Sequence, residues 1–313
     1  MSRLGVIAPH YWPTWLGLGL LRLFEPLPFP WLLRLGAALG TLLRFLPLRF
    51  VRIARRNLEL CFPEATDAER SVLLAKHFRS VGMALFETAI TWWSDDDRIR
   101  RITTLEGEEH LQRALAAGRG AILLSAHFTT LEIGARAVCA RMPVNVMYRP
   151  SRNAVLARFL LRERSKRAKR AIPRDDIRTL VAALGANEPV WYAPDQSYRK
   201  KGAQMVPFFG IPAATNTATS RLARMTGAVV LPYFVERLPG SEGYRVVIHP
   251  PLGFPERRRD PGCSSLQRAD RGASAAGARS IPVDPPTLQG ADGGLSGLLL
   301  TRQGAGMSKG TAS

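Results

Sequence analysis

The chain has 313 residues, 46% of them hydrophobic, which is enough to bury a large core in one large domain or two modest ones. Its formal net charge of +19 predicts attraction to an anionic partner: nucleic acid, an acidic membrane surface, an acidic protein or a phosphorylated substrate. The three cysteines, Cys61, Cys139 and Cys263, lie far apart without paired or metal-ligand spacing, which argues against a disulfide framework or a zinc site.

The beginning of the chain is strongly apolar, and we interpret residues 1–50 as a membrane anchor. Residues 4–21 carry no charged side chain and include Tyr11, Trp12 and Trp15, whose rings favour the bilayer interface. Two prolines interrupt this stretch, so one span, a re-entrant hairpin and an element lying on the surface all stay open. A cleaved secretory signal is the alternative, but no small-residue cleavage site follows the apolar run. Arginines concentrate after the segment, which places the rest of the chain on the cytoplasmic side: Arg44, Arg49, Arg52, Arg55 and Arg56, against Arg3 before it.

Residues 51–255 are predicted to form an α/β domain. From 51 to 93 apolar positions recur at helical spacing, with Thr66 and Asp67 as a helix start, and we expect two helices on or near the membrane. Short apolar runs then alternate with helical stretches, which indicates a mostly parallel central sheet flanked by helices. Residues 256–313 lack aromatic side chains and apolar periodicity, and we expect them to be disordered.

A histidine and a glutamate stand where a strand gives way to a helix. "AILLSAHF" ends a buried strand and "TTLEIGAR" begins a helix, so His127 lies at the carboxyl edge of the sheet and Glu132 in the first helical turn. A neutral imidazole can take a proton from a hydroxyl, and a carboxylate on its other nitrogen fixes the tautomer. Two alternatives stay open: Thr129 to Glu132 also fits a capping box, and His127 fits a hydrogen-bonded histidine at the core edge.

Further motifs give this pair a context. "AHFTTLE" resembles the motif of glycerolipid acyltransferases, in which an acid follows a histidine by five positions, within the lysophospholipid acyltransferase-like superfamily. With "YRP" (148–150), "RDDIR" (174–178), "VWYAPDQSY" (190–198) and "LARMTGAVVLPYF" (222–234), residues 10–255 resemble the lipid A biosynthesis acyltransferases of the lauroyl and myristoyl type.

This resemblance implies a bacterial enzyme of the inner membrane, with its catalytic domain on the cytoplasmic side. Such enzymes transfer a fatty acyl chain from acyl carrier protein to a hydroxyacyl chain of a lipid A precursor. By the resemblance, His127 is the general base on the acceptor hydroxyl and Glu132 orients it. No cofactor and no metal is implied, because the acylated carrier is the co-substrate.

Three further residues are candidates for substrate binding. Arg149 can pair with a substrate phosphate or help hold a developing oxyanion. Asp195 and Arg174 can orient Arg149 or the substrate, while an ordinary surface arginine and a structural ion pair are the alternatives. A basic cluster fits docking of acyl carrier protein or anionic membrane lipid, or is a solvated helix face: Arg162, Arg164, Lys166, Arg167, Lys169 and Arg170.

The end of the chain departs from the family pattern. Members continue past the "YRVVIHPP" strand to a segment containing Trp-x-His-Arg, which residues 256–313 lack. "SIPVDPPTLQG" (280–290) can be encoded so that loss of one base restores such a segment, and we hypothesise a frameshift beginning around 253–262. An inactive membrane-associated remnant is therefore one alternative function. A lysophospholipid acyltransferase, which uses the same chemistry, is the other. Nucleic-acid binding has no accompanying helix-turn-helix, zinc or RNA-recognition signature.

Overall fold

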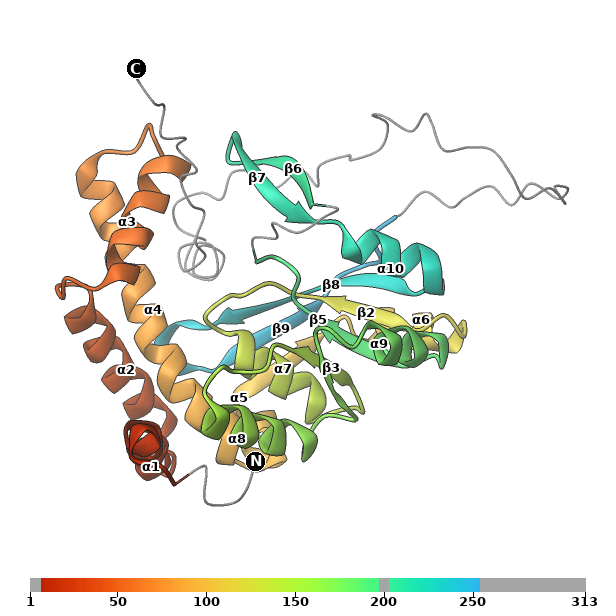
Figure 1. Cartoon of the computed structure of the whole chain (residues 1–313), viewed down its shortest axis with the longest axis horizontal. Helices are drawn as coiled ribbons and strands as arrows, with labels where there is room; N and C mark the ends of the chain where they lie inside the picture. Colours follow the sequence, from red (N-terminus) through yellow and green to blue (C-terminus); the bar gives the residue numbers. More distant parts are fainter. Residues whose placement is uncertain (1–6, 197–202, 254–313) are drawn as a thin grey trace, which may run out of the picture.

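A seven-stranded sheet forms the centre of the computed structural model, which describes residues 7–196 and 203–253. The strand order is β1-β9-β8-β2-β5-β3-β4, with helices on both faces (Figure 1). The strands are β1 (Thr103–Glu106), β2 (Ala121–Leu124), β3 (Asn145–Tyr148), β4 (Ala171–Pro173), β5 (Pro189–Tyr192), β8 (Val229–Arg237) and β9 (Tyr244–Ile248). The predicted α/β class with a mostly parallel sheet is confirmed.

Strand direction decides where the carboxyl ends meet. β2 pairs in parallel with β5 and with β8, and β3 pairs in parallel with β5 and β4. Two strands run the opposite way within the sheet: β9 is antiparallel to β8, and β1 is parallel to β9. Five neighbouring strands therefore end at the same edge, where ligands bind in open α/β sheets.

The two faces of the sheet are buried against different helices, as the two-residue period of a strand requires. Leu123 belongs to a core cluster with Ile133 of α7, whereas its neighbour Ile122 packs with Leu180 of α9 on the other face. The helices around the sheet are α5 (Asp96–Ile102), α6 (Glu108–Ala116), α7 (Leu131–Cys139), α8 (Ala154–Ser165), α9 (Ile177–Gly185) and α10 (Ala218–Thr226).

The first four helices of the described chain lie along one side of the sheet (Figure 1). They are α1 (Trp12–Phe24), α2 (Phe29–Leu43), α3 (Arg49–Cys61) and α4 (Asp67–Trp93), with a short 3-10 turn before them at Pro9–Tyr11. The two helices expected between 51 and 93 are present as α3 and α4. Thr66 and Glu69 form a full capping box at the start of α4, which confirms the predicted helix start.

Close contact between α2 and α4 depends on glycine. A Cβ atom at Gly40 would collide with the backbone of Phe78, and one at Gly82 would collide with the backbone of Gly36. The two helix backbones therefore touch where neither helix carries a side chain. This contact fixes α2 to the long helix that in turn packs on α7.

The stretch that we expected to be a membrane anchor forms short helices in its described part. α1 and α2 have 13 and 15 residues, and no helix in residues 7–196 or 203–253 is both long and apolar enough to cross a bilayer. Both helices nevertheless expose large apolar side chains, among them Trp12, Trp15 and Trp31.

A two-stranded hairpin stands apart from the main sheet. It consists of β6 (Ala203–Phe208) and β7 (Ile211–Asn216), paired antiparallel, and projects above the sheet in Figure 1. The expected disorder of residues 256–313 and the hypothesised frameshift lie outside the described residues.

Candidate active site

The parallel strands bring most of the predicted site residues to one edge. His127 follows β2, Arg149 follows β3, Arg174 follows β4 and Asp195 follows β5. Because β5 lies between β2 and β3, the loops that carry His127 and Asp195 come from adjacent strands. The shared edge thus follows from the topology.

His127 and Asp195 are in direct contact. The Nδ1 atom of His127 lies 2.6 Å from Oδ1 of Asp195, and the backbone N–H of His127 donates to Oδ2 at 2.8 Å. The two side chains are about one third exposed, 32% for His127 and 30% for Asp195. The pair is therefore rigidly connected and still open to a substrate.

This arrangement can perform base catalysis. A carboxylate at Nδ1 favours the tautomer with its proton there, which leaves the lone pair on Nε2 free to accept a proton. The same carboxylate stabilises the imidazolium once that proton has arrived. A hydroxyl placed at Nε2 would thus be activated as a nucleophile.

Glu132 lies in the first helical turn, as predicted, but it does not contact His127. It is the second residue of α7, and its carboxylate accepts a hydrogen bond from Arg164 of α8 at 2.6 Å. The Arg164 guanidinium also stacks over the ring of Tyr148, 5.5 Å from its centroid. Across residues 7–196 and 203–253, His127 and Glu132 share no hydrogen bond or ion pair. The strand-to-helix turn is present, but it carries Glu132 towards α8.

The capping-box alternative for Glu132 is wrong. The N-cap of α7 is Thr130, and its side chain does not cap the helix but donates to the carbonyl of Val235 at 3.1 Å. The hydroxyl of Thr129 instead shares a 2.7 Å hydrogen bond with Ser80 of α4. Both threonines therefore fasten the loop after His127 to neighbouring elements.

A buried polar network extends behind this loop. Arg237 of β8 donates to the Ser80 hydroxyl at 2.8 Å and to Glu87 at 2.7 Å, and Tyr244 of β9 donates to the same Glu87 oxygen at 2.8 Å. Glu87 is only 1% exposed, and this burial raises the pKa of its carboxyl, while Arg237 and Tyr244 oppose that rise. The network ties α4, β8 and β9 together directly under the His127 loop.

Arg149 and Arg174 lie at the same edge of the sheet but take no part in the contact between His127 and Asp195. Both are exposed, and Arg174 lies 3.5 Å from the carboxylate of its neighbour Asp175. Arg149 makes no side-chain hydrogen bond or ion pair within the described part of the chain. Neither arginine is paired with Asp195. Arg149 can meet an anionic group of a substrate directly, whereas Arg174 shares its charge with Asp175.

Two glutamates partly neutralise the positive charge of the basic cluster. Glu163 pairs with Lys166 at 2.7 Å and Arg167 at 2.9 Å, and Glu188 pairs with Lys169 at 2.8 Å and Arg170 at 3.1 Å. Arg162 is 74% exposed and only 3.9 Å from Glu163 at its nearest atom.

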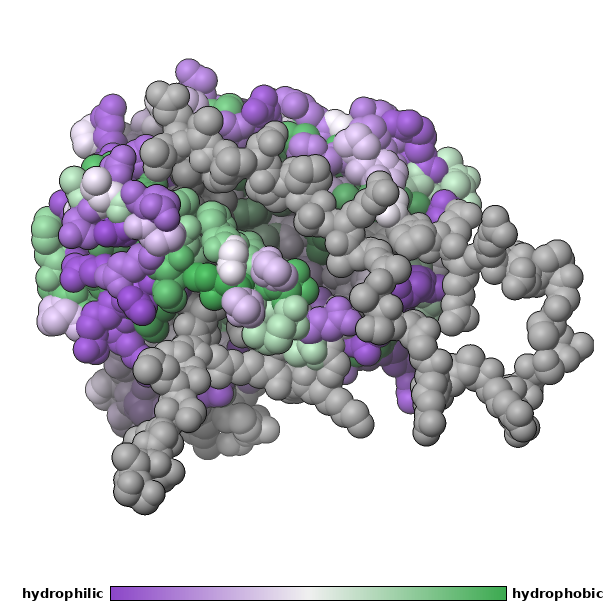
Figure 2. Space-filling model, turned by 90° about the horizontal axis from the view of Figure 1, so that it is seen from above, coloured by the Kyte–Doolittle hydropathy of each residue, from purple (hydrophilic) through white to green (hydrophobic). Residues whose placement is uncertain are grey.

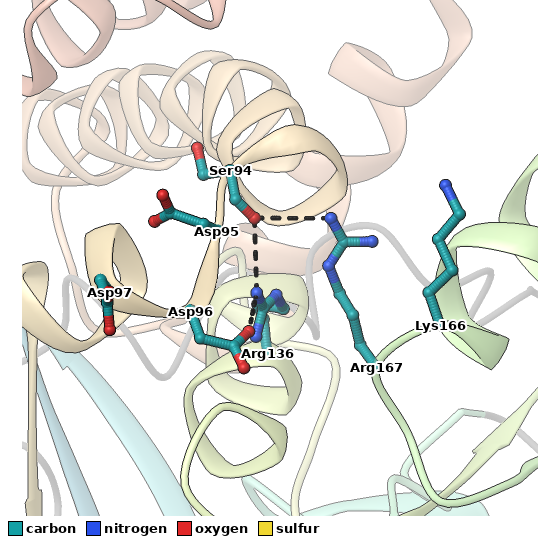
Figure 3. A pocket seen from close by; sticks show the side chains of 7 residues that line it. All are labelled: Ser94, Asp95, Asp96, Asp97, Arg136, Lys166 and Arg167. Carbon is teal, nitrogen blue, oxygen red and sulfur yellow. Dashed lines mark hydrogen bonds and ion pairs between the residues drawn. The ribbon is translucent and has the colours of Figure 1, made fainter.

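A cavity of about 460 Å³ borders Lys166 and Arg167 of this cluster (Figure 3), and His127 does not line it. Its walls mix acids and bases, and Arg136 and Arg167 both point at the Ser94 carbonyl. The lining residues are Ser94, Asp95, Asp96, Asp97, Arg136, Lys166 and Arg167. The residues described contain no group of His, Cys, Asp and Glu side chains suited to hold a metal ion.

Comparison with known proteins supplies the family. The family model for bacterial lipid A biosynthesis acyltransferases matches residues 4–271. The chain belongs to this family. Membership makes it an acyltransferase of lipid A biosynthesis.

Individual lipid A acyltransferases are similar over most of their length. The lipid A biosynthesis lauroyltransferase of Escherichia coli is 42% identical over 248 residues, covering 79% of this chain and 81% of the relative. The palmitoleoyltransferase of the same organism is 41% identical over 249 residues, with the same coverage. A lipid A biosynthesis acyltransferase of Haemophilus influenzae is 38% identical over 252 residues, covering 79% and 80%.

Proposed function

We propose that this lipid A acyltransferase moves a fatty acyl chain from acyl carrier protein to a hydroxyacyl chain of the lipid A precursor, with His127 as the general base. The observation that carries the proposal is the exposed contact between His127 and Asp195 at the carboxyl edge. It supplies an oriented base with an open nitrogen, which is what a hydroxyl acceptor needs.

The reaction proceeds by addition and elimination at the thioester. Nε2 of His127 takes the acceptor proton as the acceptor oxygen bonds to the thioester carbonyl carbon. The tetrahedral intermediate then breaks its carbon–sulfur bond, and the departing thiolate receives the proton held by the imidazolium. Asp195 stabilises the imidazolium between these two steps.

Glu132 takes a positioning role in this proposal. Its ion pair with Arg164 holds that guanidinium over Tyr148, the last residue of β3 and the neighbour of Arg149. Glu132 would thus set the position of the β3 loop, while Asp195 orients the imidazole.

Arg149 and Arg174 are proposed to bind the acceptor. Both are exposed at the edge where His127 lies, and a guanidinium can bind phosphate through two parallel hydrogen bonds. The acidic acyl carrier protein is proposed to dock on α8 through the exposed Arg158 and Arg162, whose charges are least neutralised by neighbouring acids.

We place the protein at the bacterial inner membrane, with its catalytic domain on the cytoplasmic side and α1 and α2 in contact with lipid. Trp12, Trp15 and Trp31 are 63%, 46% and 56% exposed on these helices. Tryptophan is favoured at the bilayer interface, and short apolar helices can lie in its plane.

A transfer assay tests the proposed chemistry. Purified protein is given lauroyl-, myristoyl- and palmitoleoyl-carrier donors and a lipid A precursor, and His127→Ala is compared with His110→Ala on α6. We expect His127→Ala to lose roughly 10²- to 10⁴-fold in rate, with His110→Ala unaffected. Equal rates in both variants would refute His127 as the base.

The same assay separates the alternatives. No transfer by the unaltered protein with any donor would favour an inactive remnant. Transfer to a lysophospholipid in preference to the lipid A precursor would favour the other acceptor.

A further inference from the structure

The β6–β7 hairpin exposes several large apolar side chains. Met205 is 64% exposed, Phe209 40%, Phe208 37% and Val206 37%. The two strands pair with each other from Ala203 to Asn216 and with no other described strand. A two-stranded ribbon is marginally stable in water, and contiguous exposed apolar surface marks a site of interaction.

The hairpin closely follows the candidate active site in the sequence and contacts the end of α3. It follows Asp195 in the chain, separated only by residues 196–202. Its turn residue Phe209 packs edge-on against Phe62, just past the end of α3, with ring centroids 5.2 Å apart. The hairpin turn and the end of α3 thus adjoin.

Helix α3 adds positive charge to this surface. Arg49, Arg52 and Arg55 are exposed on it, and none of them forms an ion pair with any described residue. Seen from above, a hydrophobic area in the region of the hairpin adjoins a hydrophilic area over α3 (Figure 2). An anionic bilayer surface has an apolar layer beneath negatively charged headgroups. Apolar side chains beside arginines without an ion pair are suited to bind both layers.

We propose that the hairpin turn and α3 together bind the surface of an anionic lipid bilayer. Phe208 and Phe209 enter the headgroup layer, and the three arginines pair with lipid phosphates. This contact rests on the proposed function, since it would let the acceptor lipid pass from the bilayer to His127.

A bilayer fits the hairpin better than an acidic protein does. Successive side chains of a strand point to opposite faces, so Met205 and Val206 lie on different faces of the ribbon and both are exposed. A groove in a protein covers one face of such a ribbon, whereas the headgroup layer surrounds both.

Site-specific fluorescence tests the contact without needing turnover. Full-length protein carrying Cys263→Ser and Phe208→Cys is labelled with an environment-sensitive dye, and Gln112→Cys on α6 is the matched control. Cys61 is buried, and burial raises the pKa of Cys139 to about 12, so neither native thiol competes for the dye. Vesicles contain phosphatidylcholine alone or phosphatidylcholine with phosphatidylglycerol.

The proposal predicts a blue-shifted emission at position 208 with phosphatidylglycerol vesicles and an unchanged emission at position 112. No shift at position 208 overturns it, whether or not the protein transfers acyl chains. A shift caused by acyl carrier protein and not by vesicles also overturns it, because it would make the hairpin a protein-docking site.

Substitutions measure the two halves of the surface separately. Phe208→Ser with Phe209→Ser should lower vesicle affinity roughly tenfold or more, because two exposed aromatic rings no longer enter the lipid. Met225→Ser on α10, where the side chain is 62% exposed, should leave the affinity unchanged. Replacing Arg49, Arg52 and Arg55 by glutamine should abolish the preference for phosphatidylglycerol; a preference that persists would remove α3 from the proposal.

Discussion

Asp195 holds His127 at two points, the imidazole Nδ1 and the backbone N–H, at 2.6 and 2.8 Å. One carboxylate therefore sets both the rotation of the ring and the position of the loop that carries it. Each strand brings one partner, because β2 and β5 are adjacent and parallel. The free nitrogen of the ring faces away from this double contact.

The two acidic residues of the site should respond differently to loss of charge. Asp195→Asn should lower kcat by roughly 10²- to 10⁴-fold with little change in KM, because the tautomer and the imidazolium lose their carboxylate. Glu132→Gln should lower kcat less and should resemble Arg164→Gln, its ion-pair partner. Steady-state kinetics of the three variants decide the matter, and a Glu132→Gln defect larger than that of Asp195→Asn would reverse the two assignments.

The hydroxyl of Ser80 should matter for catalysis although it lies on α4. Ser80→Ala removes the hydrogen bonds to Thr129 and Arg237, which loosens the loop that begins at His127. We expect kcat to fall several-fold with KM nearly constant, since misplacement of a base by a fraction of an ångström slows proton transfer. Ser80→Thr, which keeps a hydroxyl, should recover part of the rate.

A matched control lies on the same helix. Ser71 is exposed near the start of α4, and Ser71→Ala should have wild-type kinetics. Equal kinetics for Ser80→Ala and Ser71→Ala would show that the network under the loop has no catalytic effect.

Gly82 should be indispensable for the contact between α2 and α4. A methyl group there would collide with the backbone of Gly36, so Gly82→Ala should reduce the free energy of unfolding by about 1–3 kcal/mol. Gly17→Ala on α1, where no atom lies within 4 Å of the added carbon, should be neutral or slightly stabilising. Denaturant titration measures both, and a Gly82→Ala midpoint at or above wild type would contradict the backbone contact.

His77 should make stability fall in mild acid. It is 4% exposed on α4, both ring nitrogens lack a partner among the described residues, and burial lowers its pKa from 6.5 to about 4. Between these two values the unfolded chain binds a proton that the folded chain does not, so stability decreases as the pH falls through that window. The loss reaches about 3 kcal/mol at pH 4.

Removal of the imidazole isolates this effect. His77→Leu should flatten the curve of unfolding free energy against pH between 6.5 and 4, leaving only the contribution of carboxylates. Parallel curves for the two proteins would mean that His77 is protonated equally in the folded and unfolded states.

Local sequence patterns were sufficient to predict helices and strands and to place His127 at the carboxyl edge of the sheet. The apolar run before His127 and the helical spacing after it correctly predicted β2 and α7, and Thr66 correctly marked the start of α4. These features depend on residues that are close in the chain.

The partners of these residues were not predictable in the same way. Asp195 meets His127 only because β5 lies beside β2, and the pairing order of strands is not written in the spacing of either segment. Glu132 contacts Arg164, which is 32 positions away, and Ser80 contacts Thr129, which is 49 positions away. Both contacts arise from the packing of helices. The membrane anchor was likewise predicted from hydrophobicity alone. The break between α1 and α2 falls at Pro26 and Pro28.

The order of the strands also constrains how the protein is made. β9, the last strand of the sheet in the chain, is inserted between β8 and β1, the first. Until Tyr244–Ile248 has left the ribosome, β1 has no neighbour and the facing side of β8 is an open edge able to pair with other chains. Assembly of this sheet is therefore expected to wait for nearly 250 residues of synthesis, which makes its nascent chain a candidate client for chaperones.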